Sequence, residues 1–200
     1  MDSELFIDIQ RPYAMADARA AWLFCDRHDP SAIAYTFVDG DESRSISYGE
    51  LRDDSVRLAN GLRELGVGPG TRVATLVRKG PELVTTMLAV WRLGAVYVPL
   101  FTAFAQKAVD LRMRAAEVRV VVTDSSQRSK IPEFAHDVKV LVVDGGGEPG
   151  DIDYRELFAA ATADPFESHA QGADGALVHI FTSGTTGSPK GVIHPLQHVA

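Results

Sequence analysis

The spacing of apolar and polar positions predicts a first helix that begins near residue 47. Ser47 is followed three positions later by Glu50, and this pair can form a reciprocal capping box at a helix N-terminus. Apolar or small side chains then recur at three- and four-residue steps, as expected for one buried helix face: Leu51, Ser55, Leu58, Ala59, Leu62 and Leu65. Gly66 and Gly68 are typical helix terminators, so we expect the helix to end there.

The next segments predict a strand, a helix and a second strand. Residues 72–77 form a short, mostly apolar run, which is typical of a strand buried on both faces. Pro81 suits the first turn of a helix over residues 82–93, and Gly94 ends it before a strand over residues 95–100. A strand, helix, strand unit of this kind predicts a parallel pair with a right-handed crossover.

The same alternation continues toward the end of the chain. We expect a helix over residues 107–117, strands over 118–123 and 138–143, and a helix over 154–161. The predicted fold class is therefore α/β: a doubly wound, mostly parallel sheet with helices on both faces. The glycine-rich residues 145–150 are interpreted as a surface loop within one domain, because the next helix resumes within a few residues.

Composition narrows the class of protein without naming its chemistry. The 200 residues are 46% hydrophobic, which suits one sizeable globular core. A net charge of -7, with both signs mixed along the chain, gives no basic face for nucleic acid or an anionic membrane. No apolar run reaches the roughly 18 residues of a membrane span, the first residues are acidic, and Cys25 has no disulfide partner. These features predict a cytoplasmic protein without a nucleic-acid partner or a membrane span.

The segment with the most chemical information follows a strand predicted over residues 176–181. It combines hydroxyl side chains, glycines and one lysine, the groups that hold a polyphosphate through backbone amides, hydroxyl donors and a point charge. It is not a Walker loop, because Pro189 and Gly191 occupy positions that this motif gives to glycine and to a hydroxyl residue. Residues 192–194 predict a returning strand. Composition alone leaves a phosphate cradle and a plain hairpin loop equally open.

The order of residues in this segment is similar to a known signature. It resembles the phosphate loop of the adenylate-forming superfamily, which includes acyl-CoA synthetases, adenylation domains and luciferases: Phe181-Thr182-Ser183-Gly184-Thr185-Thr186-Gly187-Ser188-Pro189-Lys190-Gly191-Val192. Two earlier stretches, residues 47–51 and 92–100, are similar to the same family in the expected order. The resemblance covers roughly residues 30 to 200, and the AMP-forming acyl-CoA synthetases are the group it indicates.

The resemblance implies a two-step reaction with ATP, Mg²⁺ and coenzyme A. A carboxylic acid would form an acyl-adenylate with release of pyrophosphate, and a thiol would then take the acyl group. The residues implied to hold the leaving phosphates are Thr182, Ser183, Gly184, Thr185, Thr186, Gly187 and Lys190, of which Thr185, Thr186 and Lys190 are the main candidates. No catalytic residue and no metal ligand is assigned within the chain.

The resemblance further implies that residues 1–200 are the N-terminal part of a larger AMP-binding domain, ending just after the phosphate loop. The magnesium ligand, the adenine contacts, the catalytic lysine and the C-terminal lid would then lie beyond residue 200, and these 200 residues alone would be inactive. Residues 94–104 look most like short-chain members, acetyl- or propionyl-CoA synthetases among them. The alternatives are an adenylation domain that loads a carrier-protein thiol, a ligase with another acceptor, and a non-catalytic nucleotide-binding α/β module.

Several other side chains are candidates for function, and a structural role is the expectation for each. His179 is expected in the sheet core, His194 in a structural or substrate-pocket position, and His198 in solvent. Three aromatic residues at the end of a predicted strand are expected in the core: Tyr97, Phe101 and Phe104. Three arginines are expected to form a solvated face: Arg112, Arg114 and Arg119.

Overall fold

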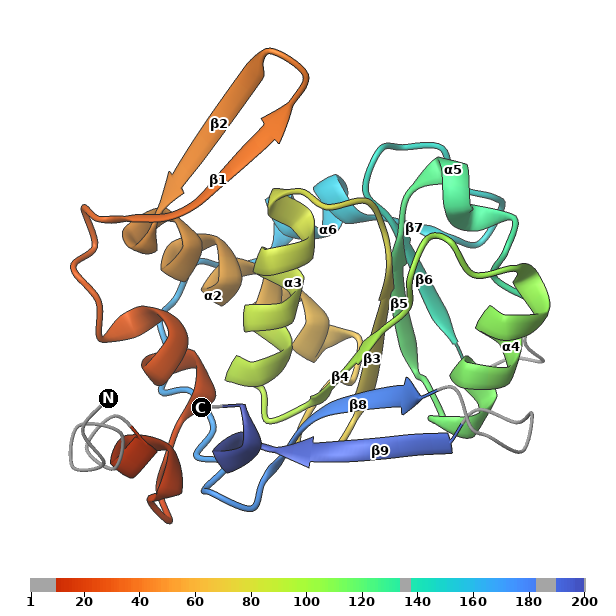
Figure 1. Cartoon of the computed structure of the whole chain (residues 1–200). Coiled ribbons are helices and arrows are strands. Elements are labelled where there is room, and N and C mark those ends of the chain that lie inside the picture. Colours follow the sequence, from red (N-terminus) through yellow and green to blue (C-terminus); the bar gives the residue numbers. More distant parts are fainter. Residues whose placement is uncertain (1–9, 134–137, 183–189, 200) are drawn as a thin grey trace.

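A seven-stranded sheet forms the centre of the fold in the computed structural model, which describes residues 10–133, 138–182 and 190–199. Its strand order is β7-β6-β5-β3-β4-β8-β9 (Figure 1). The strands are β3 (Arg72–Leu76), β4 (Val96–Pro99), β5 (Val120–Thr123), β6 (Lys139–Val142), β7 (Ile152–Asp153), β8 (Ala176–Thr182) and β9 (Lys190–Pro195). Neighbouring strands from β7 to β8 run parallel, and β8 pairs with β9 antiparallel.

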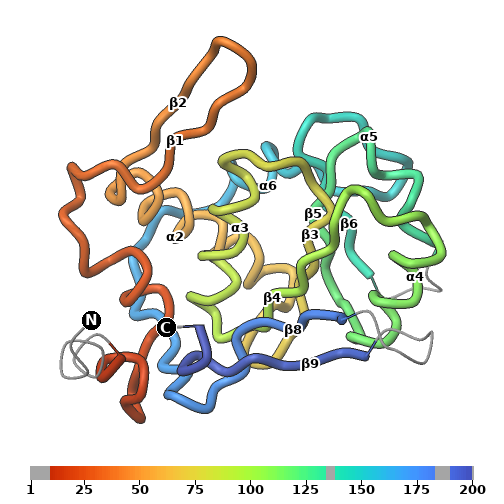
Figure 2. Tube along the Cα trace, in the orientation of Figure 1, coloured from red at the N-terminus to blue at the C-terminus, as the bar shows by residue number. Residues whose placement is uncertain are grey.

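Helices lie on both faces of this sheet, as Figures 1 and 2 show. One apolar cluster joins the sheet to α2 (Tyr48–Glu64), α3 (Pro81–Arg92) and α6 (Tyr154–Ala160). A second cluster joins the opposite face to α4 (Gln106–Ala115), and the short α5 (Ser125–Arg128) follows β5. Within β3, Val73 belongs to the first cluster and Ala74 to the second, because successive strand residues point to opposite faces. The predicted doubly wound α/β class is confirmed.

The start and end of α2 follow the local sequence signals. Ser47 Oγ accepts a hydrogen bond from the Glu50 amide at 3.2 Å, and the Ser47 amide donates to Glu50 Oε2 at 2.7 Å, so the capping box is formed. The helix ends at Glu64 and Gly66 follows with a φ of 86°. The predicted stripe is buried from Leu51 to Leu62 and faces α3 and the sheet.

The predicted strand, helix, strand unit is also present. β3 and β4 are parallel neighbours, and Pro81 lies in the first turn of α3. Gly94 follows the helix with a φ of 70°, and a Cβ there would lie 2.4 Å from His169 Cδ2. The positive φ therefore favours glycine at this position, and a side chain there would also have to displace the exposed ring of His169.

The N-terminal third contains elements that the sequence pattern did not predict. β1 (Ile33–Asp39) and β2 (Glu42–Ser47) form an antiparallel hairpin that projects from the rest of the chain (Figure 1). Before it lie two short helical turns, η1 (Arg11–Ala14) and η2 (Trp22–Asp26). A third short helical turn, η3 (Leu196–His198), lies far from these in the sequence and follows β9. Most hairpin residues are exposed, so the hairpin contributes little core and its apolar pattern is weak.

Two expectations about side chains after β4 are wrong. Phe101 is not in the core but 58% exposed, because it lies after the end of β4. Its ring packs edge-to-face on Phe104, with ring centroids 5.3 Å apart. Arg112 is not solvated but 8% exposed, because it shares the inward face of α4 with Val109 and Met113. Burial lowers the pKa of Arg112.

The arginine is accommodated by local contacts. Arg112 Nη1 donates to the Ala108 carbonyl at 2.8 Å, and the guanidinium lies 4.1 Å from the centre of the half-buried Phe104 ring. Tyr97 is buried and Arg114 and Arg119 are exposed, as expected. Phe104, expected in the core, is half-buried and packs against the edge of the second cluster.

No helix in the described part of the chain is long and apolar enough to cross a membrane.

Candidate functional site

The predicted phosphate loop joins the end of β8 to the start of β9. Thr182 and Lys190 are directly opposite each other in the β8–β9 ladder, and both are exposed. Thr182 Oγ1 donates to the Lys190 carbonyl at 3.5 Å. Five other predicted phosphate contacts lie outside the described residues: Ser183, Gly184, Thr185, Thr186 and Gly187. The structure therefore brings the two ends of the loop together, and the roles of the intervening residues stay predictions.

The strand that follows the loop runs back along β8. Phe181 is opposite Gly191 and His179 is opposite Ile193, so the predicted loop connects two antiparallel strands. A Walker loop would instead lead from its strand into a helix. The returning strand predicted over residues 192–194 is confirmed, within the longer β9.

Beneath the ends of the loop lies a stack of two rings. His179 and Phe181 are both buried on the same face of β8, with ring centroids 4.8 Å apart and planes inclined by 21°. Burial, and secondarily the charge of Arg72, lower the pKa of His179, which favours a neutral imidazole. The expectation of a sheet-core histidine is confirmed. His194 is half-buried, and His198 is exposed as expected.

The polar groups at this edge are of kinds that can bind phosphate oxygens. Thr182 and Lys190 are exposed at the end of β8. The Lys190 ammonium suits contact with anionic oxygens, and the Thr182 hydroxyl, whose one proton is directed to the Lys190 carbonyl at 3.5 Å, suits it only when that weak hydrogen bond is released. Among the described residues there is no group of three histidine, cysteine or carboxylate side chains that could hold a metal ion. The described residues therefore supply no cluster of ligands for Mg²⁺, and a phosphate site at this edge stays a prediction.

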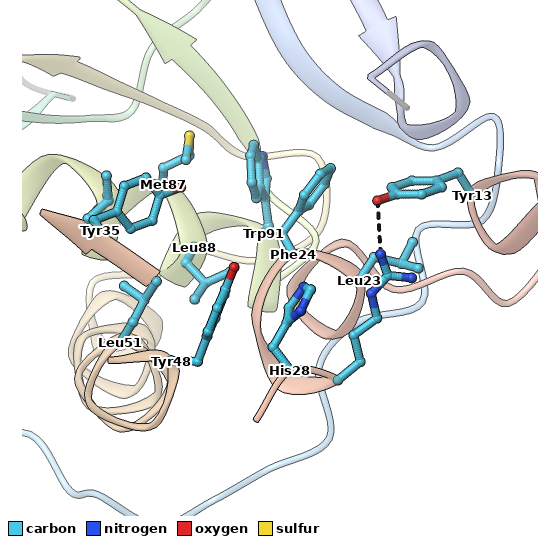
Figure 3. Close-up of a pocket in the computed structure, with 12 residues that line it drawn as sticks. Tyr13, Leu23, Phe24, His28, Tyr35, Tyr48, Leu51, Met87, Leu88 and Trp91 are labelled. Carbon is cyan, nitrogen blue, oxygen red and sulfur yellow. Dashed lines mark hydrogen bonds between the residues drawn. The ribbon is translucent and has the colours of Figure 1, made fainter. Parts of the chain in front are cut away.

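A separate cavity of about 420 Å³ lies over the α2–α3 face, and Figure 3 shows its lining. Six of its side chains are aromatic: Tyr13, Phe24, His28, Tyr35, Tyr48 and Trp91. The His28 and Tyr48 rings stack with centroids 4.4 Å apart, and Trp91 Nε1 donates to the Leu177 carbonyl at 3.2 Å. These rings come from distant segments without a common motif, so sequence reasoning did not single out this cavity.

Comparison with known proteins places the chain in a family. The model of the family described as AMP-binding enzyme matches residues 23–200. An acetyl-coenzyme A synthetase of Bacillus subtilis is 35% identical over 184 residues, which cover 88% of this chain and 32% of that protein. A 4-coumarate–CoA ligase of Oryza sativa subsp. japonica is 36% identical over 159 residues, which cover 78% of this chain and 28% of that protein.

Solved structures agree with this placement. The crystal structure of an acyl-CoA synthetase from Brucella canis superposes with a TM-score of 0.86 at 34% identity, over 98% of this chain and 36% of that one. The N-terminal subdomain of NpsA from Klebsiella oxytoca gives a TM-score of 0.72 at 25% identity, over 92% of this chain and 43% of that one.

The sheet order and the strand, loop, strand device thus define an α/β protein with the N-terminal architecture of acyl-CoA synthetases. The chain belongs to the AMP-binding enzyme family. It spans about a third of the length of the relatives it matches.

Proposed function

We propose that this chain is the N-terminal part of an AMP-forming acyl-CoA synthetase whose phosphate loop runs from Thr182 to Lys190. In the complete enzyme, the loop holds the β- and γ-phosphates of ATP while a carboxylic acid is activated. The contacts assigned to the loop are Thr182, Ser183, Gly184, Thr185, Thr186, Gly187 and Lys190. Mg²⁺ and coenzyme A are the other cofactors, and their ligands lie in the rest of the enzyme.

The observation that carries the proposal is the pairing of Thr182 with Lys190 at the end of β8. Because Thr182 and Lys190 are directly opposite in the ladder and both are exposed, their side chains leave the β8–β9 pair on the same face. A lysine acts on phosphate as a point charge, and hydroxyls add directed hydrogen bonds. Family membership over residues 23–200 supports the same assignment.

The reaction requires little covalent chemistry from these residues. A carboxylate oxygen of the acid attacks the α-phosphorus of ATP, the bond to the bridging oxygen of the β-phosphate breaks, and pyrophosphate leaves. The thiol sulfur then attacks the acyl carbon, its proton is lost, and AMP leaves with the bonding electron pair. Phosphoryl chemistry of this kind depends mainly on positioning and on stabilising developing charge, and Lys190 and the loop hydroxyls supply both to the leaving pyrophosphate.

At least two classes of carboxylic acid are candidates for the substrate. The relatives with 35% and 36% identity are named for acetate and for 4-coumarate, so identity does not separate a short-chain acid from an aromatic acid. We propose short-chain acids first, because residues 94–104 look most like that subclass. The thiol acceptor is proposed as coenzyme A, with a carrier-protein thiol as the alternative.

The test is acid-dependent exchange of labelled pyrophosphate into ATP by the full-length enzyme. Acetate, propionate, butyrate and 4-coumarate form the first panel, each with and without coenzyme A. Exchange that requires one of these acids is the expected result. Release of phosphate from ATP without exchange, for every acid of a broad panel, would show that the loop serves another reaction.

A lysine pair tests the loop itself. Lys190→Ala is expected to slow exchange on the order of 10²-fold, as loss of a charge-stabilising donor does in other enzymes. Lys139→Ala is the matched control, because it removes the same charge at the amino end of β6, where Lys139 Nζ donates to the Leu65 carbonyl at 2.9 Å. Equal exchange rates in the two variants would exclude Lys190 from the mechanism.

A further inference from the structure

The imidazole of His179 occupies the space that a side chain at Gly191 would fill. A Cβ built on Gly191 would lie 2.3 Å from His179 Nε2 and 3.3 Å from His179 Cδ2. It would also lie 3.1 Å from Phe181 Cε1. The first distance is far below any normal carbon–nitrogen contact, so any side chain at residue 191 would force the ring or β9 to shift.

Packing, rather than backbone conformation, is the reason for glycine at this position. Gly191 lies within the regular β9 ladder opposite Phe181 and is not among the glycines with a positive φ. Another residue could therefore adopt its backbone conformation without strain. What excludes a side chain is the ring of His179, which lies diagonally across the β8–β9 pair on the same face.

The histidine is not explained by stability alone. Its side chain is buried, stacked on Phe181, and its Nδ1 atom makes no hydrogen bond to any residue that the structure describes. A buried polar atom without a partner costs free energy, and an apolar side chain of similar shape would avoid that cost. The neighbouring Arg72 adds a like charge if the ring is protonated.

We propose that His179 is a positioning residue for the phosphate loop. Its ring packs against the Cα of Gly191 and so fixes the start of β9, which holds Lys190 opposite Thr182. The part of this inference that concerns phosphate rests on the proposed function, because it acts through Lys190. The part that concerns the backbone of residues 190–193 stands on the packing alone.

Three variants form a cycle with a defined pattern. Gly191→Ala drives its methyl group into the ring, so the ring or β9 must shift. His179→Ala removes the ring and leaves a void beneath β9. In the double variant the methyl group enters the vacated space, and only its 3.1 Å approach to Phe181 Cε1 stays tight. The double variant is therefore closer to wild type than either single variant.

Backbone hydrogen exchange measures the proposed effect without reference to activity. Exchange of the amides in residues 190–193 is expected to be about tenfold faster in each single variant, relative to the amides of β3 and β5 in the same protein. In the double variant, the exchange rate of residues 190–193 relative to that of β3 and β5 should return most of the way to the wild-type value. If Gly191→Ala does not fold, the comparison of His179→Ala with the double variant still decides the result.

Gly94→Ala is the control for general destabilisation, because it combines a collision with the strain of a positive φ at a distant point. Its Cβ would lie 2.4 Å from His169 Cδ2, after α3 and at the amino end of β4. This variant should lose stability without any selective change in exchange over residues 190–193. A selective increase there would show that the response is not specific to His179.

The functional readout is the KM for ATP in pyrophosphate exchange by the full-length enzyme. Gly191→Ala and His179→Ala should each raise this KM about tenfold or more, the double variant should recover it in large part, and Gly94→Ala should not change it. Absence of exchange in wild type would contradict the proposed function but leave the hydrogen-exchange cycle decisive. Unchanged hydrogen exchange over residues 190–193 in both single variants would overturn the inference, as would a double variant no better than Gly191→Ala.

Discussion

Removal of the Asp26 carboxylate is expected to destabilise the fold by about 3 kcal/mol. Asp26 lies at the end of η2 and forms a two-point ion pair with Arg92 at the end of α3. Arg92 Nη1 is 2.9 Å from Asp26 Oδ2, and Arg92 Nη2 is 2.5 Å from Asp26 Oδ1. The Arg92 side chain is only 2% exposed, so Asp26→Ala leaves a buried cation without its counter-charge.

The magnitude follows from the surroundings of the guanidinium. Breaking a buried pair by removing one partner costs about 3 to 5 kcal/mol. Ser55 Oγ still accepts from Arg92 Nε at 2.8 Å, and the 21% exposure of Asp26 lets water approach from one side, so we expect the lower end of the range. For a chain of about 200 residues, about 3 kcal/mol corresponds to a fall in Tm of about 6 to 12 °C.

Urea unfolding followed by circular dichroism measures this loss. Asp110→Ala is the control, because Asp110 pairs with Arg114 on the surface of α4, where the arginine side chain is 59% exposed. That variant should cost less than about 0.5 kcal/mol. An Asp26→Leu/Arg92→Leu variant should be more stable than Asp26→Ala, since no charge is left buried. If Asp26→Ala lowers the free energy of unfolding no more than Asp110→Ala does, the reasoning is refuted, because water would then replace the carboxylate at no cost in free energy.

Ser47→Ala removes the hydroxyl that caps α2 and should lower the free energy of unfolding by about 1 kcal/mol, whereas no change would show that the cap is dispensable. Burial, and then the charge of Asp26, raise the pKa of Cys25 from 9.0 to about 12, so the native thiol should carry about a thousandfold less thiolate. A thiol reagent at pH 8 should therefore modify it only after urea is added, and rapid modification of native protein would contradict this burial. Because the folded pKa of His179 lies below its usual 6.5, the unfolded chain binds this proton first as the pH falls. Stability should thus decline from about pH 6.5 downward, and more steeply in wild type than in His179→Leu; parallel pH profiles would contradict the assignment.

Local signals in the sequence determined where α2 and α3 begin and end. The capping box at Ser47, Pro81 at the start of α3 and the glycines after α2 and α3 act within one helical turn, so their effect does not depend on distant residues. The short apolar runs likewise determined the central strands β3, β4 and β5, because a strand buried on both faces must be apolar at successive positions. The phosphate loop is predicted for a similar reason, since its residue order is itself the signal.

The tertiary structure alone decided which distant elements meet. Nothing local places β8 beside β4, joins Asp26 to Arg92 across 66 positions of the chain, or turns Arg112 inward toward the sheet, because these contacts depend on how whole elements pack. Gly191 shows the difference most directly. In the sequence it belongs to a glycine-rich loop signature, and a glycine there suggests freedom of the backbone. In the structure its backbone is an ordinary strand, and what a side chain there would collide with is the His179 ring, twelve positions earlier in the chain.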